Sequence, residues 1–143
     1  MRFKISILFC LLLAAFWSLS CSLPVLESPE CTDSREAVRK FYSFHYANDI
    51  APTPENLKAR EKYLTPQLYQ KLLSESLGKD YFTLSDTPPK AFRVAACTPI
   101  DPAKTELGVH LFWKDDTKTT QNEIEVEAVK QGDGWLVNKV TAK

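Results

Sequence analysis

His45 and Asp49 are the two residues whose chemistry and spacing together suggest catalysis. In a helix, side chains four residues apart lie on the same face, so the pair predicts an oriented histidine that acts as a general base. The predicted helix ends near Asp49, where a carboxylate opposes the helix dipole and is expected to stay solvated. The alternative interpretation is a histidine packed beside Tyr42 and Tyr46, with no catalytic role.

Aromatic residues supply the other candidates for a binding pocket. Trp113 and Trp135 lie in segments with strand periodicity and are candidates for its lining, together with Tyr42, His45 and Tyr46. Aromatic residues in strands more often belong to the core, which is the alternative for both tryptophans. The sequence has no nucleophile elbow and no glycine-rich phosphate loop, and we expect no cofactor.

The second histidine, His110, alternates with apolar neighbours and is expected to point outward from its strand together with Phe112. Two histidines without a third ligand at metal spacing do not predict a zinc site, so we expect no metal. Three alternating glutamates, at positions 123, 125 and 127, predict a solvated sheet face, with an acidic patch for a cationic partner as the alternative.

The amino-terminal twenty residues carry the pattern of a secretory signal peptide. Arg2 and Lys4 precede an apolar run from Ile5 to Trp17, and small residues follow at Ser18 and Ser20. Thirteen helical residues span about 20 Å, which is short of the roughly 30 Å hydrocarbon core of a membrane. The sequence therefore predicts a protein that is exported and cleaved rather than held by a permanent membrane span.

Cys21 directly follows this segment, and the start of the mature chain resembles a bacterial lipoprotein. In that class the first cysteine carries diacylglycerol on its sulfur and a further acyl chain on the new amino terminus. The resemblance implies a cell-envelope protein, facing the periplasm or the exterior, whose partner is a membrane reached through a lipid anchor on Cys21. Ordinary cleavage after Ser20 or Ser22 is the alternative.

If Cys21 is lipidated, Cys31 and Cys97 remain as a pair, and an oxidising compartment favours a disulfide between them. Strict alternation places Cys97 on the strand face opposite to Phe92 and Val94. Pairing therefore requires either a bulge before Cys97 or a strand that ends near Ala96. No second cysteine lies close to either residue in a Cys-X-X-Cys arrangement, so a structural disulfide is expected rather than a redox site.

Composition and length limit the remaining possibilities. Removing Arg2 and Lys4 from the 18 basic residues leaves 16 against 18 acidic residues, a net charge of −2 for the mature chain. This balance gives no support for nucleic-acid binding. We expect a signal peptide over 1–20, a lipid-anchored tether over 21–32, where prolines interrupt any periodicity, and a single domain over 33–143.

Three segments carry the signals of helices. Asp33 with Glu36 three residues later resembles a capping box, which predicts a first helix that reaches about Asn48. Thr53 and Thr65 are each followed by proline, an N-cap residue before a proline at the first helical position. They predict two shorter helices, and the second should end at Gly78.

After Gly78, a loop over 80–89 is expected to be held by its aromatic residues, and the period then becomes two. The predicted strands cover 90–97, 107–114, 123–128 and 135–142, and the glycines at 132 and 134 predict a hairpin turn before the last strand. This order predicts an α+β fold with three N-terminal helices packed on a curved four-stranded antiparallel sheet.

The same order of elements resembles the cone-shaped nuclear transport factor two-like (cystatin-like) fold. More narrowly, YLTPQLYQKL at 63–72 and GDGWLVNKV at 132–140 are similar to a family of exported bacterial domains of unknown function in that superfamily. The resemblance implies a pocket between the first helix and the concave sheet, which different members of the superfamily use for catalysis, ligand binding or protein contacts.

Three functional hypotheses follow from these observations. The first is a non-enzymatic domain of the cell envelope that binds an unidentified protein or small molecule, because no set of catalytic groups converges in the sequence. The second is a small-molecule enzyme, similar to an isomerase or dehydratase, that uses His45 or Asp49 in the cone pocket. A cone filled by Phe41, Leu111 and Trp135 would argue against this enzyme. The third is a dimerising scaffold that pairs through the outer sheet face, as a homodimer.

Overall fold

The structure is a computed structural model that describes residues 26–75 and 78–143. The predicted signal peptide, Cys21 and the first part of the predicted tether lie outside the described residues. Helices come first in the described chain and strands follow, as predicted. The elements are α2 (Pro29–Tyr46), α3 (Pro54–Arg60), a 3-10 turn (Glu61–Tyr63), α4 (Pro66–Ser74), β1 (Ala91–Asp101), β2 (Lys104–Lys114), β3 (Thr119–Gln131) and β4 (Gly134–Ala142). Over these described ranges, no helix has the length and apolarity needed to cross a membrane.

Each of the described α-helices begins with the same local pattern, a hydroxyl residue followed by proline. Thr53 and Thr65 cap α3 and α4 as predicted, since each side chain accepts a hydrogen bond from a backbone N–H three residues later. Ser28 caps α2 in the same way, with Pro29 at the first helical position. The first helix therefore begins at Pro29 rather than after Asp33, and the predicted tether over 21–32 loses its last four residues to the helix.

The helix α4 is shorter than predicted. It ends at Ser74, because Glu75 adopts an extended conformation (φ −97°, ψ 138°) instead of continuing to Gly78. The buried side of this short helix consists of Leu68, Tyr69 and Leu72, while the side chain of Leu73 is 45% exposed. An apolar residue is thus left at the surface near the end of the helix.

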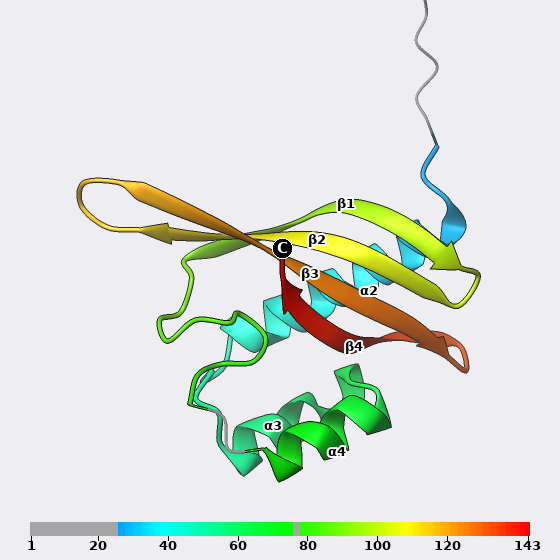
Figure 1. Cartoon of the computed structure of the whole chain (residues 1–143), viewed down its shortest axis with the longest axis horizontal. Helices are drawn as coiled ribbons and strands as arrows, with labels where there is room; N and C mark the ends of the chain where they lie inside the picture. Colours follow the sequence, from blue (N-terminus) through cyan, green and yellow to red (C-terminus); the bar gives the residue numbers. More distant parts are fainter. Residues whose placement is uncertain (1–25, 76–77) are drawn as a thin grey trace, which may run out of the picture.

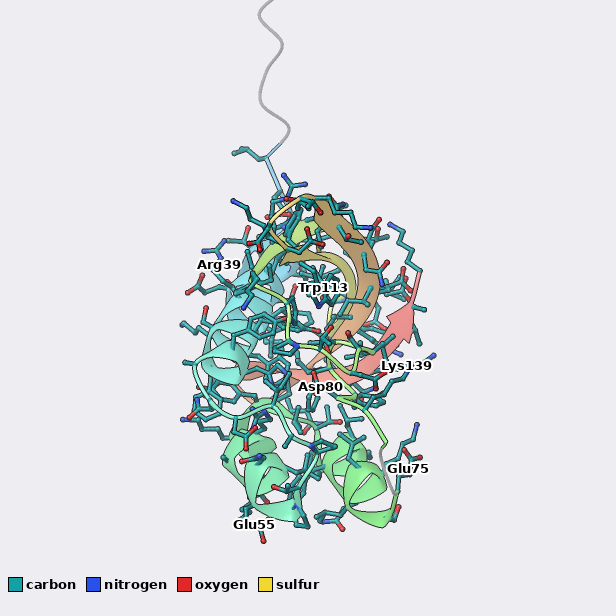
Figure 2. All side chains as sticks on the ribbon, turned by 90° about the vertical axis from the view of Figure 1, so that its left-hand side faces the viewer. Arg39, Glu55, Glu75, Asp80, Trp113 and Lys139 are labelled. Atoms are coloured by element: carbon teal, nitrogen blue, oxygen red, sulfur yellow. A yellow bond between two sulfur atoms is a disulfide. The ribbon has the colours of Figure 1, made fainter. Side chains whose placement is uncertain are left out.

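The four strands form an antiparallel meander in the order β1-β2-β3-β4. The sheet is curved, and α2 lies across its inner face, with α3 and α4 side by side beyond β4 (Figure 1, Figure 2). The predicted α+β architecture of three helices and a curved four-stranded antiparallel sheet is therefore confirmed.

Large side chains fill the space between α2 and the sheet. Phe41 from α2 and Leu111 from β2 are completely buried, and Trp135 from β4 is 8% exposed. These residues belong to one hydrophobic cluster that joins the helices to the inner sheet face. The interior of the cone is therefore a packed core.

A disulfide joins the start of α2 to β1. The Cα atoms of Cys31 and Cys97 are 5.8 Å apart, within the range that a disulfide spans, and the two sulfurs are bonded. The register of β1 against β2 shifts between Val94 and Cys97, which is the first of the two predicted solutions. The shift turns Cys97 to the inner face, where it pairs across from Leu107 and reaches α2.

Candidate functional site

A buried chain of three polar side chains lies at the C-terminal end of α2. His45 Nε2 is 2.9 Å from Asp80 Oδ2, and Arg60 Nε donates to His45 Nδ1 at 2.7 Å. The exposed fractions are 1% for His45, 2% for Arg60 and 6% for Asp80, so all three are shielded from water. We call this group the Arg60–His45–Asp80 relay. It joins α2, α3 and the loop that precedes β1.

The hydrogen bond from Arg60 determines the tautomer of His45. A guanidinium group only donates hydrogen bonds, so Nδ1 of His45 must carry its lone pair toward Arg60. In the neutral imidazole the proton is then on Nε2, which donates it to Asp80. Both ring nitrogens are engaged, and the ring joins a positive to a negative side chain through the protein interior.

Arg60 also holds the end of α2 in place. Its terminal nitrogens donate to the backbone carbonyls of His45 (3.3 Å), Asp49 (2.8 Å) and Asn56 (2.6 Å). Carbonyls at the end of a helix lack partners within the helix, and a cation there is favourable for the helix dipole. Burial lowers the pKa of Arg60, and the charges of Asp80 and Asp49 act in the opposite direction.

Asp49 does not form the predicted dyad with His45. The helix α2 ends at Tyr46, so the two residues no longer share one helix face. The exposed carboxylate of Asp49 instead accepts the backbone N–H of Ala51 at 2.9 Å, within the turn after the helix. This hydrogen bond, together with Asn56 and Arg60, lowers the pKa of Asp49. The carboxylate that His45 contacts belongs instead to Asp80, in the loop before β1.

A cavity of about 220 Å³ lies beside the relay. It is bounded by the loop after α2, by α3, by the end of α4 and by the start of the loop before β1. In Figure 2, Asp80 lies between the sheet and the α3–α4 pair, and Glu75 lies at the end of α4. The lining residues are His45, Ile50, Ala51, Pro52, Thr53, Pro54, Asn56, Leu57, Arg60, Leu72, Leu73, Glu75, Asp80, Tyr81 and Phe82.

Of the five predicted pocket residues, only His45 lines this cavity. Tyr42 is fully buried and donates to the carbonyl of Phe82 at 2.8 Å. Tyr46 is half-buried, and its hydroxyl has no hydrogen-bond partner among the described residues. Trp113 donates to the carbonyl of Thr87 at 3.0 Å, and Trp135 belongs to the core. The predicted pocket between helix and sheet is thus displaced toward the α3–α4 pair.

The residues predicted for the outer sheet face lie there, since the strand register places His110 opposite Glu123 and away from the core. Nδ1 of His110 lies 2.5 Å from the side-chain nitrogen of Gln121, and Lys143 forms an ion pair with Glu123 at 2.6 Å. A close group of potential metal ligands among the described residues consists of Glu27, Cys31 and Cys97. Its two sulfurs are bonded to each other, so they are not available as thiolate ligands.

Two members of the relay, Arg60 and Asp80, are absent from the residues predicted for the site. They lie 15 and 35 positions after His45, in different elements, so helical spacing could not connect them. The sequence carries one local signal for Arg60. It follows the Thr53–Pro54 helix start by two turns and so lies in the last turn of that helix, where unpaired backbone carbonyls favour a basic side chain. No local pattern marks Asp80.

One of the three comparisons with known proteins bears on the fold. No protein-family model matches the chain, and no curated protein matches it by sequence. Among solved structures, the chain is similar to an "Ntf2 like protein involved in plasmid conjugation", with a TM-score of 0.52 and 11% identity. The match covers 82% of this chain and 40% of that protein, so the chain spans less than half the length of its structural neighbour. Three helices followed by a four-stranded antiparallel meander, together with this neighbour, show that the chain has a nuclear transport factor two-like fold.

Proposed function

We propose that this protein is a non-enzymatic binding domain whose binding site is the cavity beside the Arg60–His45–Asp80 relay. The observation that carries the proposal is the hydrogen bonding of His45, because both of its ring nitrogens are occupied by protein side chains. A general base needs a free nitrogen within reach of its substrate. The relay thus supports the wall of the cavity and leaves its interior for a ligand.

The size of the cavity limits the ligand. The volume of the cavity is about 220 Å³. This is smaller than the roughly 300–1,000 Å³ typical of sites for drug-sized ligands. A small metabolite, or one side chain of a larger partner, is the class of ligand that fits.

NMR spectroscopy of the mature protein with a library of small fragments tests this proposal. Binding fragments should shift the backbone amide signals of Thr53, Leu57 and Tyr81, and no fragment should be converted to a product. The variant Leu57→Trp should fill the cavity and abolish these shifts. Ile100→Trp is the matched control, because Ile100 is half-exposed on β1 and does not line the cavity. Turnover of a fragment, or shifts that persist in Leu57→Trp, would overturn the proposal.

We further propose that this domain works at the bacterial cell envelope, anchored by acyl chains on Cys21 after removal of residues 1–20. The disulfide between Cys31 and Cys97 supports this proposal, because it leaves Cys21 as the one remaining cysteine of the mature chain. The family of exported bacterial domains of unknown function is the proposed relationship, supported by the shared fold. The unidentified partner then meets the domain outside the cytoplasm.

The intact mass of the protein extracted from membranes tests the anchor. We expect the mass of the chain from Cys21 to Lys143 with diacylglycerol and one further acyl chain, minus two hydrogen atoms for the disulfide. The variant Cys21→Ala should lose the acyl chains and leave the membrane fraction. An unmodified Cys21, or cleavage after Ser22, would contradict the proposal.

A further inference from the structure

The ionised side chains around the cavity leave an excess of negative charge. Arg60 and Asp80 carry opposite charges and are joined through the neutral ring of His45, so their charges offset each other. Glu75, which follows α4, is the remaining ionised residue in the cavity lining. The lining therefore has a net charge of about −1, located at the end of α4.

The cavity lining also has more free hydrogen-bond acceptors than free donors. A guanidinium has five N–H donors, and Arg60 already uses four of them on His45, Asp49 and Asn56. A carboxylate accepts about four hydrogen bonds, and Asp80 accepts two, from His45 and from the backbone N–H of Phe82. The cavity wall thus retains more acceptors than donors, which suits a ligand rich in N–H groups.

Lys71 of this chain shows that Glu75 and Tyr81 together can hold a cation. Its ammonium is 3.8 Å from Glu75 Oε1 and 6.0 Å from the centre of the Tyr81 ring. Glu75 and Tyr81 both line the cavity, whereas Lys71 itself does not. A carboxylate and an aromatic face that both attract an ammonium make a recognisable cation site. The side chain of Lys71 is 56% exposed, so a ligand can replace it at low cost.

From these three observations we propose that the cavity binds a primary ammonium group on a short, unbranched alkyl chain. The ammonium lies against Glu75 and Tyr81, and the alkyl chain packs against Leu57 and Leu72. Either a free small amine or a lysine side chain of a partner protein carries this group, because the end of a lysine side chain is itself a butylammonium. This inference rests on the proposed binding function of the cavity.

Three molecules of equal length and different charge test the inference. In NMR titrations of the mature protein, n-butylammonium should shift the amides of Leu57 and Tyr81 at lower concentration than n-butanol or n-butyrate. Equal binding of all three, or preference for butyrate, would overturn the cation proposal while the binding function stands. Failure of every probe and of every library fragment would overturn both proposals.

Two substitutions of opposite expected effect locate the ammonium. Glu75→Gln should weaken n-butylammonium binding by on the order of threefold, since it removes one partly exposed charge pair. Lys71→Met should strengthen it by a similar factor, because the competing ammonium is removed. The matched controls are Glu36→Gln and Lys40→Met, which alter an exposed pair of the same chemistry on α2 at 3.6 Å. Equal affinities for Glu75→Gln, Lys71→Met and the unsubstituted protein would contradict this placement.

A second probe distinguishes the two sources of the ammonium. An acetylated lysine methylamide carries the butylammonium on a peptide backbone. If it binds about as tightly as n-butylammonium, a lysine side chain of a partner protein is supported. If only the free amine binds, the ammonium comes from a small molecule. Binding of neither amine overturns the inference.

Discussion

At the scale of single residues, the central feature of the molecule is a neutral histidine between an arginine and an aspartate. Burying ions is costly unless each finds partners, and the relay meets this need by placing opposite charges on the two sides of one ring. Arg60 contributes most of the contacts, since it serves His45 and three backbone carbonyls. Its loss should therefore affect stability more than any surface charge.

The substitution Arg60→Met tests this expectation. It keeps much of the side-chain volume, leaves the charge of Asp80 without compensation and deprives three carbonyls of a donor. Removing one partner of a buried pair costs about 3 kcal/mol of unfolding free energy or more. Arg39→Met is the control, because Arg39 pairs with Glu36 on the exposed face of α2 and should change stability by less than about 1 kcal/mol. Urea denaturation of both variants measures the difference, and equal losses would show that the relay is not stabilising.

Tyr42 and Tyr46 predict how stability changes at alkaline pH. Burial raises the pKa of Tyr42 well above its usual value, with smaller contributions from Tyr46, Asp80 and Tyr81. Burial, followed by the charge of Asp80, raises the pKa of Tyr46 as well. In the unfolded chain both phenols ionise near pH 10. The unfolded state therefore releases these protons first. The stability that the two buried phenols contribute is fully present below about pH 10 and is lost as the pH rises above it.

Ultraviolet absorbance of phenolate, recorded together with circular dichroism, measures this effect. Of the five tyrosines, we expect Tyr42 and Tyr46 to ionise only in the same step in which the fold is lost. In the double variant Tyr42→Phe, Tyr46→Phe, unfolding should no longer be accompanied by the ionisation of two phenols. Ionisation of all five tyrosines before any loss of dichroism would contradict the buried placement of these hydroxyls.

At the scale of elements, the starts of helices could be predicted because their signals are local. Thr53 and Thr65 each carry the whole signal in two residues, hydroxyl then proline, and both helices begin there. Ser28 has the same signal. The sequence nevertheless places it in the predicted tether, because Asp33 and Glu36 offer a second, competing start. A local pattern thus identifies a possible helix start but does not choose between two competing ones.

The relay could not be predicted in the same way. The sequence marks His45 as a candidate because Asp49 follows it by four residues, but its partners come from α3 and from an irregular loop. Asp80 contacts His45 from a loop whose Phe82, two residues later, is packed into the core. Contacts between distant segments depend on how the elements pack, and a single sequence carries no spacing rule for them.

Both edges of the sheet are blocked by side chains or by other backbone segments. On β1, Arg35 donates to the carbonyls of Val94 and Ala95 at the bulge. On β4, Thr65 donates from its backbone to the carbonyl of Val137 at 2.9 Å, and Tyr81 accepts the N–H of Val140 at 3.3 Å. A partner strand cannot form a continuous ladder along such edges. Pairing of two copies edge to edge is therefore hindered, and a homodimer through the outer sheet face stays a prediction.

The disulfide is the strongest single link between α2 and the sheet. It closes a loop of 66 residues that includes most of α2 and the whole of α3 and α4. The chain-entropy account gives about 4 kcal/mol for a loop of this length, through a more restricted unfolded state. The variant Cys31→Ala, Cys97→Ala should therefore lose about 4 kcal/mol in urea denaturation, and Cys21→Ala should lose none. Equal stability of the two variants would show that the link is not stabilising.

At the scale of the whole molecule, the start of the described chain and the cavity beside the relay lie at opposite ends of α2. The described chain enters the domain at Leu26, next to the start of the helix, whereas His45 and the cavity lie at its other end (Figure 1). Eighteen helical residues span about 27 Å. An anchor at Cys21 would thus hold the start of α2 toward the membrane and direct the cavity away from it, where an amine or a lysine side chain from outside can reach Glu75.

Paramagnetic broadening tests this orientation. When the mature protein is bound to vesicles that contain a gadolinium-labelled lipid, the amide signals of Glu30 and Thr32 should broaden much more than those of Leu57 and Tyr81, because the effect falls steeply with distance. The variant Cys21→Ala, which stays in solution, should show no broadening in either group and serves as the control. Equal broadening at both ends of α2 would mean that the domain lies flat on the membrane, with the cavity rim against the lipid headgroups.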